Sequence, residues 1–118
     1  MITTERIYDS TDIVDDRFRV LIDRLWPRGI SKQKARLDHW ARDLAPSHEL
    51  RKWYQHDHEK WSEFQIRYEK ELAMNHPKLL ELIDLVEGKD VLLLYSSKEM
   101  EKNNATVFKT YMEKIIPQ

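Results

Sequence analysis

Two short polar segments of the chain carry side chains that could bind an anion. The first runs from Arg24 to Gly29 and places two arginines on either side of a Trp-Pro pair. The second runs from Tyr95 to Lys98 and directly follows four aliphatic residues. Arginine binds carboxylate and phosphate oxygens through paired hydrogen bonds, and hydroxyl and backbone N–H groups complete such sites. We predict a small phosphate- or carboxylate-bearing ligand, bound by Arg24, Trp26, Arg28, Ser47, Arg51, Tyr95, Ser96, Ser97 and Lys98.

The first segment also has structural interpretations. Arg24 and Arg28 could hold loops in place by pairing with carboxylates such as Asp23 or Asp43. Trp26 could stack on a flat ligand, but an indole beside a proline could equally pack against the core or form a lid. The sequence leaves both pairs of alternatives open.

Asp23 is the candidate catalytic residue. It lies within an apolar stretch, so its carboxylate would be partly removed from water and would need a partner. Such a carboxylate can act as a general base, or it can be a structural hydrogen-bond acceptor.

No metal or other cofactor is predicted. The chain has no cysteine, which excludes disulfides, thiolate metal sites and cysteine nucleophiles. His56 and His58 flank Asp57, but a spacing of two residues suits metal binding only in an extended segment. Since Met1–Glu5 shows no signal-peptide pattern and no apolar run is long enough to span a membrane, we expect a cytoplasmic protein with no membrane contact.

Charge is unevenly distributed along the chain. The formal net charge is -1, which argues against nucleic-acid binding by the whole surface. Residues 17–36, however, contain seven basic side chains and a single acidic one. This segment favours a local anion site, and a non-enzymatic nucleic-acid-binding or protein-interaction module is the alternative. The oligomeric state cannot be read from these features.

Three segments have the composition of strands. Residues 2–8 are predicted to form a short strand, and residues 18–26 a longer one that is apolar on both faces and ends at Pro27. Val91 to Tyr95 has the pattern of a fully buried strand. Residues 37–45 fit either a strand or a helix.

The remaining chain has helical patterns. Ser47 is a favourable N-cap for a helix that extends to about Tyr54, in which Arg51 lies one turn from the start and the first N–H groups could also face an anion. Two further helices have the apolar positions Trp61, Phe64, Tyr68 and Leu72, and Leu79, Leu82, Ile83 and Val86. Residues 103–115 form the last predicted helix.

This alternation predicts one α/β domain over residues 1–118, with a mostly parallel sheet of about four strands and helices on both faces. In such sheets, ligands bind beyond the carboxyl ends of the strands. If the strands at 18–26 and 91–95 are parallel neighbours, the two polar segments meet at one edge.

The string Asp23-Arg-Leu-Trp-Pro-Arg-Gly29 resembles the DUF488 family, in its short, YeaO-like branch. The resemblance continues through Leu44-Ala-Pro-Ser47 and Leu93-Leu-Tyr-Ser-Ser-Lys98 and covers nearly the whole chain. It implies a compact single α/β domain, and the family has no established activity.

Longer members of the family carry a Cys-Ala-Glu type segment near the last strand and Cys-His-Arg before the final helix. In this chain the corresponding segments are Tyr95-Ser-Ser97 and Asn103-Asn-Ala105. The resemblance therefore implies that cysteine or histidine chemistry of that branch is absent here, whereas Asn104 could still donate a hydrogen bond to a ligand.

Overall fold

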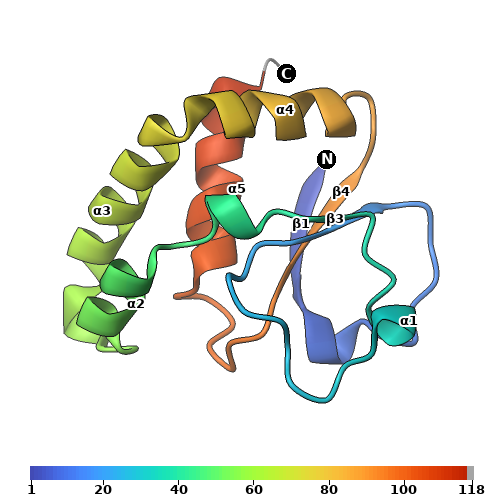
Figure 1. Ribbon diagram of the computed structural model, residues 1–118, viewed down its shortest axis with the longest axis horizontal. Coiled ribbons are helices and arrows are strands. Elements are labelled where there is room, and N and C mark those ends of the chain that lie inside the picture. The colour runs from blue at the N-terminus through green and yellow to red at the C-terminus, as the bar shows by residue number, and fades with distance from the viewer. Residues whose placement is uncertain (117–118) are drawn as a thin grey trace.

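The computed structural model describes residues 1–116 and contains a four-stranded sheet in which every neighbouring pair is parallel (Figure 1). The strands are β1 (Ile2–Arg6), β2 (Phe18–Leu21), β3 (His39–Trp40) and β4 (Val91–Tyr95), in the order β1-β4-β2-β3. Strand β4 is therefore central and pairs with both β1 and β2. The predicted parallel α/β fold is confirmed, and the two strands that precede the polar segments are neighbours.

Within the described residues, five α-helices accompany the sheet: α1 (Lys32–Ala35), α2 (His48–Tyr54), α3 (Trp61–Met74), α4 (His76–Val86) and α5 (Asn104–Ile115). The predicted helical stripes are buried at Phe64, Tyr68 and Leu72 in α3 and at Leu79, Leu82 and Val86 in α4. Ser47 caps α2 as predicted, and Asn103 caps α5. No helix within residues 1–116 combines the length and apolar character needed to cross a bilayer.

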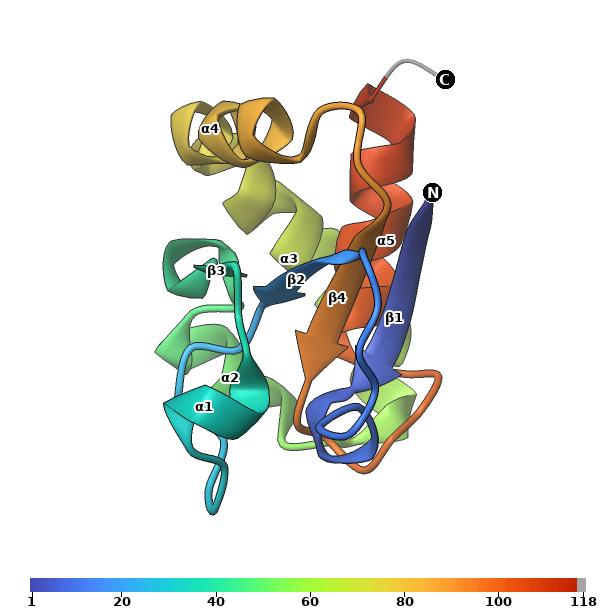
Figure 2. The same cartoon turned by 90° about the vertical axis from the view of Figure 1, so that its right-hand side faces the viewer.

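The two faces of the sheet pack against different apolar clusters. Val91, Leu93 and Tyr95 of β4 belong to the larger cluster, which includes buried residues of α2 to α5. Leu92 and Leu94 belong to a smaller cluster with Ala35 of α1 and the partly buried Trp26 and Trp40. Figures 1 and 2 show α3 and α5 on one side of the sheet and α1 on the other. Both faces of the sheet are therefore covered by helices, and the face that packs against the larger apolar cluster carries more of them.

Strand β2 is shorter than the sequence predicts, because it ends at Leu21 instead of Trp26. The backbone N–H of Ile22 still donates to the carbonyl of Leu94. In a regular parallel ladder, the N–H of Ser96 would then donate to the carbonyl of Ile22. It donates instead to the Asp23 carboxylate at 2.9 Å, while the side chain of Asn104 donates to Ile22 O at 2.7 Å. The side chains of Asp23 and Asn104 thus replace the next backbone hydrogen bond of the ladder, and β2 and β4 separate at this edge of the sheet.

Two other boundaries differ from expectation. The first strand ends at Arg6, and Ile7–Asp9 forms a 3-10 turn with Ile7 fully buried. The ambiguous segment 37–45 contains both structures, since the two-residue strand β3 is followed by a 3-10 turn at Arg42–Leu44. Strand β3 is held to β2 by the N–H of Ala41, which donates to Leu21 O.

Candidate functional site

A pocket of about 630 Å³ lies where β2 and β4 separate. Its walls come from the segment after β2, from α2, and from the segment between β4 and α5. This is the edge at which parallel sheets bind ligands. Nine of the predicted residues line the pocket: Asp23, Arg24, Trp26, Arg28, Arg51, Ser96, Ser97, Lys98 and Asn104. That they bind a ligand stays a prediction.

Ser47 and Tyr95 do not line the pocket. The backbone N–H and hydroxyl of Ser47 both donate to the Glu71 carboxylate, at 2.8 and 2.5 Å, and the hydroxyl also caps α2 by accepting from Leu50. Tyr95 is almost fully buried in the larger apolar cluster. The contacts of these two residues therefore give no support to their predicted role in ligand binding.

The pocket also contains residues that the sequence reasoning missed. Arg6 ends β1 and reaches the pocket because β1 is parallel to β4 and ends at the same edge. Lys52 follows Arg51 in α2, and Lys102 precedes α5. The rule that placed the site at the carboxyl ends of the strands would have included Arg6, had the end of β1 been predicted correctly.

The lining carries a large excess of positive charge. Its cationic side chains are Arg6, Arg24, Arg28, Arg51, Lys52, Lys98 and Lys102. Among the described residues that line the pocket, Asp23 is the one carboxylate. Throughout residues 1–116, none of these seven cations forms an ion pair. The alternative in which Arg24 and Arg28 pair with Asp23 or Asp43 therefore finds no support in the contacts.

Two of the arginines are instead positioned by backbone carbonyl groups. Arg24 donates from Nη2 to Ala45 O and from Nε to Pro46 O, each at 3.1 Å. Arg6 donates from Nε to Ser96 O and Ser97 O at 3.3 and 3.1 Å. Carbonyl groups orient a guanidinium without cancelling its charge, so both side chains keep a full positive charge beside the pocket.

Asp23 is a hydrogen-bond acceptor for three other segments. Its Oδ2 accepts from the N–H and the hydroxyl of Ser96, at 2.9 and 2.5 Å, and its Oδ1 accepts from Asn104 at 3.0 Å. Its backbone carbonyl accepts from the Trp40 indole at 2.7 Å. These contacts explain why an acid stands in an apolar segment, and they engage both carboxylate oxygens. The role of Asp23 as a general base stays a prediction.

Trp26 combines the two roles that its sequence position left open. Its indole N–H donates to Ile30 O at 2.6 Å, and its ring meets that of Trp40 edge to face at 5.3 Å. The ring is fixed against the smaller apolar cluster, yet part of it lines the pocket. Stacking on a ligand stays a prediction.

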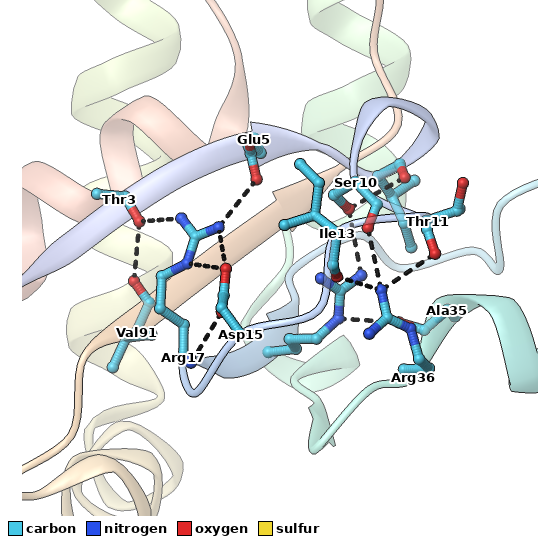
Figure 3. Close-up of polar contacts among 12 residues, drawn as sticks. Thr3, Glu5, Ser10, Thr11, Ile13, Asp15, Arg17, Ala35, Arg36 and Val91 are labelled. Carbon is cyan, nitrogen blue, oxygen red and sulfur yellow. Dashed lines mark hydrogen bonds and ion pairs between the residues drawn. The ribbon is translucent and has the colours of Figure 1, made fainter.

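Several arginines of the basic segment 17–36 are engaged in polar contacts within the fold, and Figure 3 shows those of Arg17 and Arg36. Arg17 pairs with Asp15 at 2.7 Å and lies 3.6 Å from Glu5, and the bond to Asp15 raises the pKa of Arg17. Arg19 is 6% exposed and donates to Ala35 O and to the Ser10 hydroxyl, and burial lowers its pKa.

Arg36 has a comparable structural role on the same loop. It donates to the carbonyl groups of Ser10, Thr11 and Ile13 (Figure 3). With Arg17 and Arg19, it holds residues 10–15 against the sheet. These three arginines are thus engaged within the fold, whereas Arg24 and Arg28 reach the pocket.

His58 lies in the 3-10 turn that precedes α3. His58 Nε2 lies 3.2 Å from the Glu99 carboxylate, whose pKa is lowered mainly by the backbone N–H groups of Glu101 and Lys102. Within residues 1–116, no three His, Cys, Asp or Glu side chains gather in a way that would hold a metal ion.

The fold and the pocket define a small parallel α/β protein with a cationic cleft at the carboxyl edge of its sheet. All of residues 1–118 match a family described as the inactive DUF488-N3 subclade, so the chain belongs to the DUF488 family, as the motif at Asp23–Gly29 predicts.

Two similar proteins have names without a stated activity. The uncharacterized protein YeaO of Escherichia coli is 35% identical over 114 residues, which are 97% of this chain and 98% of YeaO. The uncharacterized protein Mb3100c of Mycobacterium bovis is 40% identical over 102 residues, which are 86% of this chain and 85% of that protein. No solved structure matches the chain significantly.

Proposed function

We propose that the protein binds a small organic anion, bearing a phosphate or carboxylate group, in the pocket between the β2 and β4 ends. The observation that carries this proposal is the set of seven lysine and arginine side chains that share one cavity without an ion-pair partner in residues 1–116. Like charges repel within a concave surface, and such a surface concentrates anions. An anion in the pocket would relieve this repulsion and would accept charge-assisted hydrogen bonds.

The size of the pocket supports a ligand larger than a bare inorganic anion. Its volume of about 630 Å³ lies within the range of about 300–1,000 Å³ that is typical of small-molecule sites. The lining also includes buried apolar side chains, which inorganic phosphate alone would leave uncovered. A metabolite that carries the anionic group at one end fits both properties.

The observations favour a protein that binds this ligand without catalysing a reaction. The family is described as inactive, and the chain has no cysteine that could act as a nucleophile. Asp23 is already bonded through both carboxylate oxygens. An enzymatic role for Asp23 would require it to exchange one of these partners for a substrate.

Calorimetric titration with inorganic pyrophosphate at low ionic strength tests the proposal. We expect Lys98→Gln and Arg28→Gln each to weaken binding by about threefold to tenfold, because each removes one charge that faces the ligand. Lys70→Gln is the matched control, since Lys70 is exposed, lies on α3 outside the pocket lining, and has no ion pair or side-chain hydrogen bond within the described chain.

Equal weakening by the pocket and control variants, or no binding to the parent protein, would reject the proposal. An oligonucleotide that binds far more tightly than pyrophosphate, with an affinity that falls steeply with salt, would favour the nucleic-acid alternative.

A further inference from the structure

The pocket has an apolar floor below its cationic mouth. Tyr54 and Phe64 line the pocket and are only 6% and 3% exposed, and the buried Pro46 also lines it. The exposed cations of the lining are Arg28, Arg51, Lys52 and Lys98. A ligand held at the mouth by its anionic group would therefore extend an apolar part toward Tyr54 and Phe64.

The hydroxyl of Tyr54 is buried and has no hydrogen-bond partner within residues 1–116. This is unusual, because a buried polar group without a partner loses its hydration and gains nothing in exchange. Tyr68, in the same apolar cluster, shows the ordinary arrangement, since its hydroxyl donates to Leu44 O at 2.6 Å. Tyr54, unlike Tyr68, lines the pocket, so its unsatisfied hydroxyl belongs to a residue of the pocket wall.

The ring of Tyr54 is fixed by its neighbours. It stacks on Phe64 with a centroid distance of 4.4 Å and an angle of 29°, and it lies 6.2 Å from Trp61. Burial, together with the charges of Glu99 and Asp57, raises the pKa of Tyr54, so the hydroxyl keeps its proton near neutral pH. It is thus a well-positioned donor.

We infer that the hydroxyl of Tyr54 donates a hydrogen bond to the ligand, which is an organic anion with a hydrogen-bond acceptor at the end remote from its phosphate or carboxylate group. The inference rests on the proposed function, because the anionic group fixes the orientation in which the remote end reaches the floor. The inferred ligand has an anionic group at one end and an uncharged hydrogen-bond acceptor at the other. The part between them is apolar and preferably aromatic.

A matched pair of probes isolates this contact. The probes are 4-acetylphenyl phosphate and 4-isopropenylphenyl phosphate, which have nearly the same shape and differ in a carbonyl oxygen against a CH₂ group. We expect the parent protein to bind the acetyl compound about fivefold to tenfold more tightly, the ratio given by one hydrogen bond of ordinary net strength. In Tyr54→Phe this ratio should fall to about one, while affinity for inorganic phosphate stays unchanged.

Thermal unfolding without ligand provides the structural control. Tyr54→Phe should unfold at the same temperature as the parent or higher, because it removes an unsatisfied hydroxyl. Tyr68→Phe should unfold at a lower temperature, because it removes a hydrogen bond.

The outcomes separate the two proposals. If the parent binds phosphate and both probes but does not discriminate between the probes, or if Tyr54→Phe keeps the discrimination, the inference is wrong and the anion site stands. A loss of stability in Tyr54→Phe as large as that in Tyr68→Phe would mean that the hydroxyl has a partner inside the protein, which also overturns the inference. If the parent binds none of pyrophosphate, phosphate and the two probes, the proposed function fails and the inference fails with it. If it binds pyrophosphate but neither probe, the inference alone fails.

Discussion

The carboxylate of Asp23 connects parts of the chain that are far apart in sequence. Ser96 lies 73 residues away and Asn104 lies 81 residues away, and both donate hydrogen bonds to it. A carboxylate suits this position because it only accepts, and three donors converge on its two oxygens. The local consequence is the separation of β2 and β4 at the pocket.

Replacement of Asp23 by asparagine should therefore destabilise the fold. An asparagine amide has one oxygen, so its NH₂ group would face either the donors of Ser96 or that of Asn104. We expect the free energy of unfolding in urea to fall by about 1–3 kcal/mol. Asp43→Asn is the control and should change it by less than about 0.5 kcal/mol, because Asp43 is exposed and its side chain has no hydrogen bond within residues 1–116. Equal stability of the parent and Asp23→Asn would show that Asp23 is not a structural acceptor.

At the scale of elements, α2 is joined to α3 through the N-cap residue of α2. Ser47 caps α2, and the Glu71 carboxylate of α3 accepts from both the N–H and the hydroxyl of Ser47. The α2 helix brings Arg51, Lys52 and Tyr54 to the pocket. The contact between Ser47 and Glu71 thus positions a pocket wall without contributing to its surface.

Ser47→Ala tests this separation of roles. The variant loses the cap of α2 and one bond to Glu71, so we expect the free energy of unfolding to fall by about 1–2 kcal/mol. Affinity for pyrophosphate, measured well below the unfolding temperature, should match that of the parent. Ser62→Ala, at an exposed position of α3 without a side-chain hydrogen bond among the described residues, should leave both quantities unchanged. A loss of affinity without a loss of stability would return Ser47 to the list of ligand-binding residues.

The elements that sequence reasoning predicts well are those fixed by local rules. The stripe of α3, the N-cap of α2 and the aliphatic run of β4 each depend on residues close together in the chain. The end of β2 could not be predicted, because it depends on hydrogen bonds made by the side chains of Asp23 and Asn104 to partners 73 and 82 residues away in the sequence. Contacts between residues this far apart in the sequence also shape the site, and composition does not reveal them.

The candidate site was partly predictable for a similar reason. Because parallel strands end at one edge, the arginines after β2 and the serines after β4 could be placed together before the structure was known. Arg6 was missed because the first strand was predicted to extend beyond it, although β1 ends at the same edge. The unsatisfied hydroxyl of Tyr54 depends on packing in three dimensions, which no spacing in the sequence indicates. The hydrogen bonds that Arg17, Arg19 and Arg36 make within the fold could not be predicted either, because they also depend on packing in three dimensions.

At the scale of the whole molecule, the tyrosines should determine stability in alkaline solution. Burial is the main cause that raises the pKa of Tyr54, Tyr68 and Tyr95, most strongly for Tyr68. A raised pKa means that the folded protein holds these protons after the unfolded chain has released them. The stabilisation is therefore complete below pH 10.0, the ordinary tyrosine pKa, and is lost as pH rises above it.

Urea unfolding from about pH 8 to about pH 11 measures this effect. The parent should lose stability above pH 10.0 more steeply than Tyr68→Phe, by up to about 1.4 kcal/mol per pH unit, although the variant is less stable at neutral pH. Parallel curves for the two proteins would contradict the assignment of a raised pKa to Tyr68.

The hydrogen bonds at Asp23 also limit how the pocket can be altered. Asp23, in the segment after β2, accepts hydrogen bonds from Ser96 in the segment after β4, and Asn104 donates to both Asp23 and Ile22 O. The spacing between these two walls is therefore set by two side chains. Arg28 and Lys98, by contrast, make no side-chain hydrogen bond or ion pair within the described chain. If the pocket binds an anion as proposed, exchange of Arg28 or Lys98 would change which anion it prefers without disturbing the hydrogen bonds that hold the two walls.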